Sequence, residues 1–118
     1  MIYIKEKDEI MVFYVKKIKN GFAGKAHGFI ILILKKYKDD KGLHEHEKTH
    51  VKQWWKMGLL IHSLLYKFNK KYRYKCELEA YGVQMRYSNY PELYAKYIST
   101  RYNLDVSYEE ALRNLKGE

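Results

Sequence analysis

The sequence predicts an α+β protein in which a small N-terminal antiparallel sheet is followed by a bundle of helices. β-Branched and aromatic residues gather in short runs before residue 37, as is typical of strands. From residue 43 onward, apolar residues recur at the three- and four-residue spacing of helices. A length of 118 residues allows one hydrophobic core. We therefore expect a single domain over residues 1–118, with strands mainly in 1–37 and helices mainly in 43–117.

We expect strands at residues 2–4, 10–18 and 29–34. Residues 19–28 read as a loop, because Asn20-Gly21 is a strong turn signal. The apolar residues of 29–34 do not alternate with polar ones. This strand is therefore expected to be buried on both faces, or to have its edge covered by another segment.

We expect helices at residues 43–57, 59–68, 72–87, 91–102 and 107–117. Gly58 ends or kinks the first of them, and the apolar segment 59–68 is expected to be mostly buried. Pro91 suits the first turn of the fourth helix. Ser107 and Glu110 match a capping box at the start of the fifth.

The first predicted helix carries His46-Glu47-Lys48-Thr49-His50, which has the pattern His-Glu-x-x-His. Residues four apart lie on one face of a helix, so His46 and His50 can direct imidazole nitrogens at one metal ion. Glu47 then lies beside the metal, where its carboxylate can take a proton from a metal-bound water. The pattern therefore predicts a zinc site with Glu47 as the general base of a hydrolase.

A catalytic zinc site usually has three protein ligands, so a third must come from another part of the chain. Glu77 and Glu79 lie on the third predicted helix. Because they are two residues apart, they point to different sides of that helix, and only one can face the metal. The spacing alone leaves both open.

These residues give the chain a resemblance to the glutamate zincins, a class of zinc metallopeptidases. His46, Glu47 and His50 match the zincin signature, and Glu77 matches the first position of a Glu-x-x-Ala stretch in such families. The stretch after the motif, His50-Val51-Lys52-Gln53, is similar to small HExxH proteins of phages and bacteria. The resemblance covers about residues 28–85. It implies Zn²⁺ as the cofactor, Glu77 as the third ligand and a peptide or protein as the substrate.

The resemblance departs from the family pattern at one position. Larger relatives often have Asp four residues after the glutamate ligand, where it braces a metal-bound histidine, and here that position is Tyr81. A phenol can accept a hydrogen bond from an imidazole but supplies no negative charge. We therefore expect Tyr81 beside the metal ligands and a lower zinc affinity than in those relatives.

A peptidase also needs a hydrogen-bond donor for the tetrahedral intermediate. The candidates are His62, Tyr66, Tyr72 and Tyr74, although aromatic residues at helical spacing more often belong to a core. The resemblance further implies that the strand at 29–34 accepts an extended peptide by edge pairing.

Other residues near the motif have simpler interpretations. His44 points to a different side of the helix from His46 and is expected to be solvated. Cys76 is expected to pack as a buried cysteine. Trp54 and Trp55 are expected to fill the core and the wall of the site.

The cysteine count and the lengths of the apolar runs limit the compartments in which we expect the protein. Cys76 is the only cysteine, so an intrachain disulfide is excluded. The N-terminal residues do not have the pattern of a signal peptide, and no apolar run reaches the ~20 residues of a membrane span. We therefore expect a cytoplasmic protein without a membrane span; the oligomeric state is not predicted.

Two alternatives to the peptidase stay open. A formal charge of +9 and 13 tyrosines would suit a nucleic-acid-binding module that uses basic residues for phosphates and tyrosines for stacking. That interpretation leaves the metal-ligand spacing unexplained and is not favoured. A zincin-like site without catalytic activity, in a protein that acts by binding, is the other alternative.

Overall fold

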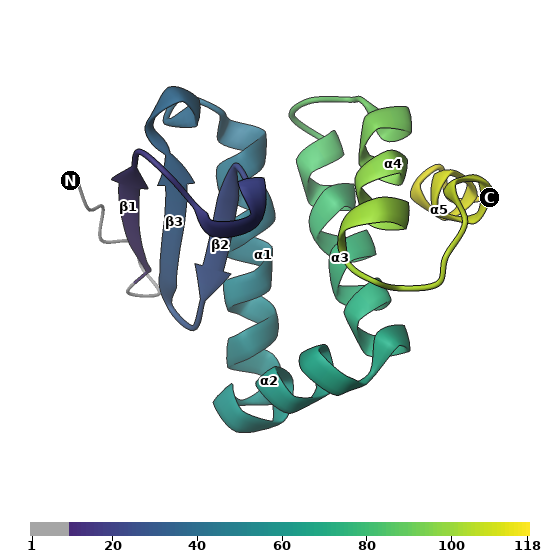
Figure 1. Cartoon of the computed structure of the whole chain (residues 1–118), viewed down its shortest axis with the longest axis horizontal. Coiled ribbons are helices and arrows are strands. Elements are labelled where there is room, and N and C mark those ends of the chain that lie inside the picture. Colours follow the sequence, from purple (N-terminus) through teal and green to yellow (C-terminus); the bar gives the residue numbers. More distant parts are fainter. Residues whose placement is uncertain (1–9) are drawn as a thin grey trace.

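The computed structural model describes residues 10–118, so the predicted strand at 2–4 lies outside the described part. The predicted α+β class is confirmed, with a three-stranded sheet followed by helices (Figure 1). The strands are β1 (Met11–Val15), β2 (Gly24–His27) and β3 (Ile30–Leu34), and short 3₁₀ turns lie at Lys19–Gly21 and Lys35–Tyr37. The helices are α1 (Lys41–Met57), α2 (Leu59–Phe68), α3 (Lys70–Met85), α4 (Pro91–Arg101) and α5 (Tyr108–Leu115).

The sheet is mixed, and the prediction of an antiparallel sheet is wrong in this respect. The strand order is β1-β3-β2, with β1 parallel to β3 and β2 antiparallel to β3. β2 and β3 form a hairpin around Gly28, whose φ of 62° favours glycine. The segment predicted as a loop contains β2. Since this extra strand reverses the chain before β3, β3 runs in the same direction as β1.

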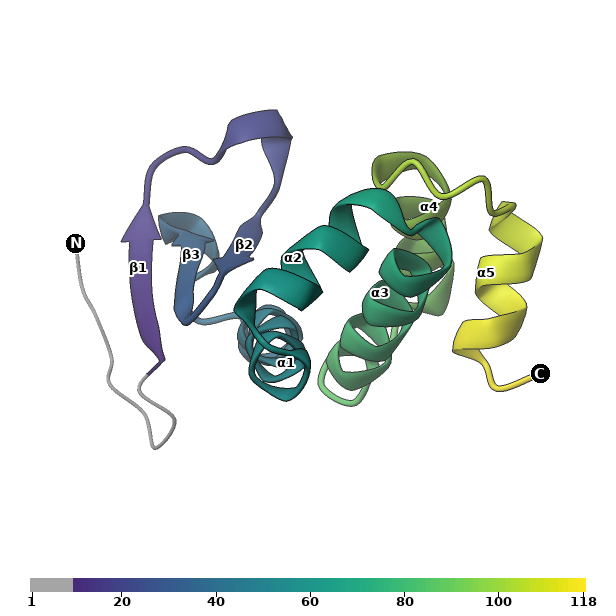
Figure 2. The same ribbon diagram turned by 90° about the horizontal axis from the view of Figure 1, so that it is seen from below.

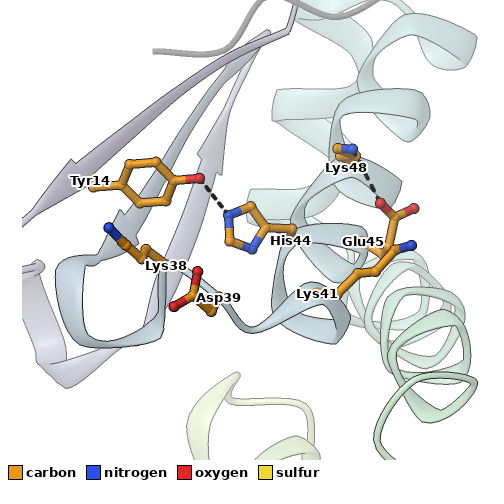
Figure 3. A pocket seen from close by; sticks show the side chains of 7 residues that line it. All are labelled: Tyr14, Lys38, Asp39, Lys41, His44, Glu45 and Lys48. Carbon is orange, nitrogen blue, oxygen red and sulfur yellow. Dashed lines mark hydrogen bonds and ion pairs between the residues drawn. The ribbon is translucent and has the colours of Figure 1, made fainter. Parts of the chain in front are cut away.

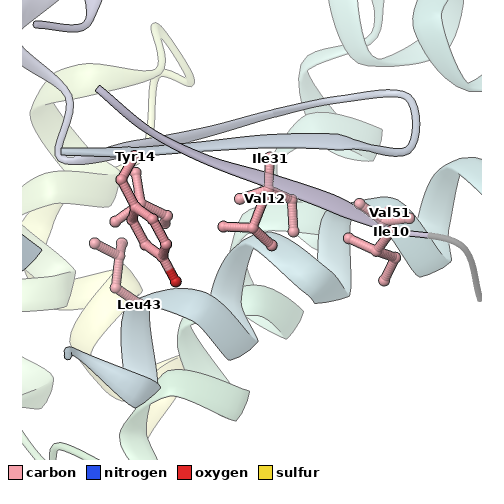
Figure 4. Close-up of a cluster of buried hydrophobic side chains, with 7 residues drawn as sticks. Ile10, Val12, Tyr14, Ile31, Leu43 and Val51 are labelled. Carbon is pink, nitrogen blue, oxygen red and sulfur yellow. The ribbon is translucent and has the colours of Figure 1, made fainter. Parts of the chain in front are cut away.

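The sheet packs against α1 through one face only. Side chains alternate between buried and half-buried along β1 and β3, so β3 is not buried on both faces. β1 and β2 pair with its two edges, so the other expected arrangement, an edge covered by another segment, is the one observed. We call the resulting cluster the sheet-side core (Figure 4); it consists of Ile10, Val12, Tyr14, Ile31, Ile33, Leu43 and Val51.

A second cluster, the helix-side core, joins α3, α4 and α5. Tyr81 stacks on Tyr94 with ring centroids 5.2 Å apart. Ser107 caps α5 by accepting a hydrogen bond from the backbone N–H of Glu110, as the capping box predicts. The buried members of the helix-side core are Tyr81, Tyr94, Ala95, Ile98, Leu104 and Ala111.

Arg73 ties three segments of the helical half together. Its guanidinium donates to the carbonyl oxygens of Tyr66 and Lys67 at the end of α2. It also donates to the carbonyl oxygens of Tyr102 and Asn103, which follow α4. These bonds satisfy a buried cation with backbone dipoles.

α2 crosses between the ends of α1 and α3 (Figure 2). It has no buried residue, so the prediction of a mostly buried segment is wrong. Only one side of α2 faces its neighbours, and its apolar residues continue around the outside. Trp55 is likewise 57% exposed and fills no core, whereas Trp54 packs near Gly28 and Phe29. Within residues 10–118 no helix is long and apolar enough to span a membrane.

Candidate metal centre

The His-Glu-x-x-His residues lie on the inner side of α1, as the helical spacing predicts. Asp40 begins this helix by accepting a hydrogen bond from the backbone N–H of Leu43. His46 and Glu47 are buried, and His50 is half-buried. One ligand atom from each of these three residues lies within 4.8 Å of the others. This group could hold a metal ion.

α3 adds a carboxylate at the same place. Glu77 is 1% exposed, with Oε1 3.6 Å from His46 Nε2 and Oε2 3.2 Å from His50 Nε2. Glu47 Oε2 is farther from His46 Nε2, at 4.0 Å. Among the described residues, Glu77 Oε1 and His46 Nδ1 are buried without a hydrogen-bond partner. A buried carboxylate oxygen without a hydrogen-bond partner fits a ligand position for a cation.

The charges of these groups are strongly coupled. Burial raises the pKa of Glu47, while His46 and His50 oppose this rise. Burial would also raise the pKa of Glu77, but the nearby histidines outweigh it and hold that pKa well below its usual range. Burial lowers the pKa of His50, yet the charge and hydrogen bond of Glu77 overcome this effect and raise it to about 9. Without a metal, His50 and Glu77 therefore form an ion pair at neutral pH.

Gln53 orients His50. The Nδ1–H of His50 donates to Gln53 Oε1 at 2.9 Å, which leaves Nε2 directed at Glu77. Gln53 Nε2 in turn donates to the carbonyl of Cys76 and to Glu79 Oε1. Glu79 is exposed and bonds to Gln53, whereas Glu77 is the carboxylate that approaches the two histidines. The sequence analysis missed the role of Gln53, although its position three residues after His50 was a usable signal.

Tyr81 lies where the sequence placed it but makes a different contact. Its ring packs edge-on against His46, with centroids 4.3 Å apart. Its hydroxyl bonds to the hydroxyl of Tyr102 at 2.8 Å and not to an imidazole nitrogen. Burial is the main cause of the raised pKa of both phenols. Tyr81 is therefore a neutral neighbour of His46.

The four candidate donors lie in different places. Tyr66 donates a hydrogen bond to Glu77 Oε2, so it holds the carboxylate from α2. His62 and Tyr72 bond to each other at 2.8 Å. Tyr74 accepts from Asn114 of α5. Of these four hydroxyl and imidazole groups, only that of Tyr66 touches the cluster.

A cleft of about 370 Å³ opens onto His46 and Glu47. The sheet side of the molecule contributes the loop before β2 and Tyr37, and the helix side contributes α3, α4 and the segment after α4. Tyr102 lines this cleft beside Tyr81, a position that no sequence signal indicated. The aromatic side chains among the lining residues are Phe22, Tyr37, Tyr81, Tyr90, Tyr94, Tyr97 and Tyr102.

β2, rather than β3, is the strand available beside the site. β3 is central, so the prediction that it pairs with a peptide at an edge is wrong. Among the strands of residues 10–118, β2 lies at an edge of the sheet. Gly24 in β2 approaches Glu47 closely: a Cβ on Gly24 would lie 3.0 Å from Glu47 Oε2. Residues 24–27 have a low strand propensity, so the sequence pattern did not indicate this strand.

His44 lies outside the metal cluster, as expected, but it is not simply solvated. It lies in a separate surface pocket of about 260 Å³ (Figure 3). Its Nδ1–H donates to the carbonyl of Asp40, and its Nε2 accepts from the hydroxyl of Tyr14 at 2.9 Å. Cys76 is buried, as expected, and burial raises the pKa of its thiol to about 11.

Comparisons with known proteins do not add to this picture: no protein-family model, no curated protein and no solved structure matches the chain. What the structure shows is a buried group of His46, Glu47 and His50 that could hold a metal ion.

Proposed function

We propose that this protein is a zinc-dependent peptidase. The observation that carries the proposal is the position of Glu47, whose buried carboxylate lies 4.0 Å from His46 Nε2, belongs to the same group as His50 and lines the cleft. A general base in a metallopeptidase needs this combination of a neighbouring metal and access to substrate.

The spacing of the donor atoms fits zinc. Two ligands bound tetrahedrally to one zinc at about 2.0–2.1 Å lie about 3.4 Å apart. Glu77 Oε1 lies 3.6 Å from His46 Nε2, and its other oxygen, Oε2, lies 3.2 Å from His50 Nε2, so each histidine has a carboxylate oxygen near this spacing. Two imidazoles and one carboxylate are also a donor set of catalytic zinc sites. We therefore assign His46, His50 and Glu77 as ligands.

Glu47 acts as the proton carrier in the proposed reaction. Zinc would supply a Lewis acid that lowers the pKa of a bound water and polarises the scissile carbonyl. Glu47 accepts the proton of the attacking water and then delivers it to the leaving amine. Burial raises the pKa of Glu47, which brings this carboxylate closer to the range in which a group can both take and return a proton.

Two features of the cleft serve the substrate. The outer edge of β2 can pair with an extended peptide through backbone hydrogen bonds, and Gly24 leaves room for Glu47 beneath it. Tyr81, whose ring packs against His46, shares a hydroxyl hydrogen bond with Tyr102, and both residues line the cleft. Because burial keeps both phenols protonated, Tyr102 can donate to the developing oxyanion.

Elemental analysis and peptide digestion test the proposal together. Metal-replete protein should hold stoichiometric zinc, His46→Ala should lose it, and Glu47→Gln should keep it. Hydrolysis of a mixed peptide library, followed by mass spectrometry, should fall by about 10²–10⁴-fold in Glu47→Gln. Glu45→Gln is the matched control, since Glu45 pairs with Lys48 on the same helix and should leave both properties unchanged.

Each contrary result has a definite meaning. Metal-replete protein without zinc would refute the zinc site. Zinc without hydrolysis over a broad peptide set would indicate the inert alternative. The nucleic-acid alternative is weakened because the rings of Tyr66, Tyr72 and Tyr74, which would have to stack on bases, are only partly exposed.

A further inference from the structure

α2 presents a contiguous apolar surface to solvent. Leu60, Ile61, Leu64 and Phe68 recur at helical spacing, so they share one side of the helix. All four are exposed, Leu60 by 69% and Phe68 by 73%. We call these four residues the α2 face. An exposed cluster of large aliphatic and aromatic side chains indicates an interaction site.

The opposite side of α2 is already in use. His62 and Tyr66 point inward and bond to Tyr72 and Glu77 of α3. Figures 1 and 2 show α2 at one end of the molecule, with α1 and α3 on its inner side. The α2 face therefore needs a partner from outside the described chain.

The chain segment that carries the α2 face is basic, and exposed Asp105 pairs with Lys70 just after the helix. No acidic residue occurs between Glu47 and Glu77. Lys56 precedes α2 at the end of α1, and Lys67 lies in its last turn; both are exposed, as is Trp55 beside Lys56. The surface thus combines apolar side chains with flanking cations, which is the pattern of helices that lie in an anionic lipid interface.

Other partners fit this surface less well. A second copy of the chain would bring lysines against lysines. A nucleic acid would place its phosphates and polar groove edges against leucine and isoleucine. An anionic bilayer satisfies both features at once, because the acyl region receives the apolar side chains and the headgroups pair with the lysines.

We propose that the α2 face docks on a membrane surface rich in anionic lipid, with α2 parallel to the bilayer plane. This role is independent of peptide hydrolysis. It would place the metal centre, which is linked to α2 through Tyr66 and Glu77, close to the lipid surface.

Vesicle sedimentation tests the apolar part of the proposal. The full chain should bind vesicles of equal parts phosphatidylglycerol and phosphatidylcholine, and bind pure phosphatidylcholine vesicles much more weakly. The double variant Leu60→Glu with Phe68→Glu should lower the partition coefficient more than tenfold. Tyr87→Glu, at an exposed aromatic position outside α2, is the control and should bind like the parent.

A second pair of variants tests the charge. Replacing Lys56 and Lys67 by glutamine should weaken binding by about 25-fold, since each lysine near an anionic surface contributes about fivefold. Replacing Lys96 and Lys116 by glutamine changes the net charge equally at distant exposed positions and should have little effect. Added salt should weaken binding of the parent.

Fluorescence reports the contact itself. In a Trp54→Phe background, Trp55 is the single tryptophan, and its emission should shift to the blue when anionic vesicles are added. No vesicle binding at low salt, equal binding to neutral vesicles or equal losses in the control variants would each overturn the proposal. So would a lipid-free dimer that the Leu60→Glu and Phe68→Glu substitutions dissociate, because the α2 face would then be a self-association interface.

Discussion

The sheet-side core and the helix-side core hold the two walls of the candidate site with different chemistry. Apart from Tyr14, the sheet-side core is aliphatic and offers no polar atom to the cleft. The helix-side core contains Tyr81 and Tyr94, and Tyr102 packs against it. The phenols of Tyr81 and Tyr102 also line the cleft. A packing change within the sheet-side core should therefore affect stability alone, and one within the helix-side core should affect both stability and chemistry.

The largest effect is expected at the centre of the sheet-side core. Ile31→Ala should lower the free energy of unfolding by about 2–5 kcal/mol, because the substitution leaves a cavity in a fully buried position. Chemical denaturation measures this loss. The folded fraction should keep its zinc affinity and its hydrolytic rate. A changed rate per folded molecule would contradict the division between the two cores.

The next largest effect concerns the ligand that the helix side contributes. Glu77→Gln should weaken zinc binding more than hundredfold, because substitutions of residues that only orient a metal ligand already cost about 10–100-fold and Glu77 is itself assigned as a ligand. Glu79→Gln, the control on the same helix, should cost tenfold or less, since Glu79 bonds to Gln53 and lies outside the group of assigned ligands. Competition with a chromogenic chelator measures both. Equal losses would return Glu79 to the ligand set.

Tyr102→Phe tests whether the helix-side phenols take part in chemistry. The variant should lower kcat by about 10²-fold, as expected for the loss of an oxyanion donor, while zinc content stays the same. Tyr97→Phe is the matched control in the same cleft wall. Steady-state kinetics on one peptide substrate would separate kcat from KM. A loss confined to KM would make Tyr102 a binding residue instead.

Gly24→Ala tests the sheet-side wall at its closest approach to Glu47. The added methyl group would lie 3.0 Å from Glu47 Oε2 and 3.1 Å from Ile33 Cδ1, so the carboxylate must shift. We expect kcat to fall by about tenfold or more, since misplacement by an ångström can cost 10²-fold. Zinc binding should persist. Ala26→Gly is a control on the same strand, and unchanged kinetics in Gly24→Ala would remove β2 from the site.

The smallest expected effect is a gradual change of zinc affinity with pH. Metal binding requires neutral His50, whose pKa without metal is raised to about 9, so binding should release a proton. Zinc affinity should therefore rise about tenfold per pH unit between pH 6 and 8. Calorimetry in two buffers of different ionisation enthalpy measures the proton release. A pH-independent affinity would contradict the ion pair between His50 and Glu77.

The ion pair between His50 and Glu77 also determines how the stability of the metal-free protein changes with pH. The pKa of His50 is higher in the folded state than its ordinary 6.5. Its contribution to stability is thus complete below pH 6.5 and is lost as the pH rises through about 9.

Local patterns predicted most of the helices, and they nominated the three residues of the group that could hold a metal. His46, Glu47 and His50 depend only on helical geometry, and that geometry holds in α1. Glu77 could be nominated because it lies on a predicted helix in a family-like stretch. Its approach to both histidines, however, depends on how α3 packs against α1, which spacing does not encode.

The features that escaped the sequence depend on tertiary context. Residues 24–27 have weak strand propensity and form β2 only because β3 offers a partner. The apolar content of α2 predicted burial, but hydrophobicity does not distinguish a core from an exposed interaction surface. Tyr102 is one tyrosine among 13, and only the fold brings it into the cleft.

Four hydrogen bonds from Arg73 to backbone carbonyl oxygens join α2, α3 and the segment after α4 to one another. Two of those carbonyls belong to α2, which carries Tyr66, and two follow α4, where Tyr102 lies. A polypeptide cut off after α3 would leave this cation half-satisfied in the interior and would uncover Tyr81. The smallest autonomous version of the metal centre should therefore include α4 and the segment after it, although none of the assigned ligands lies there.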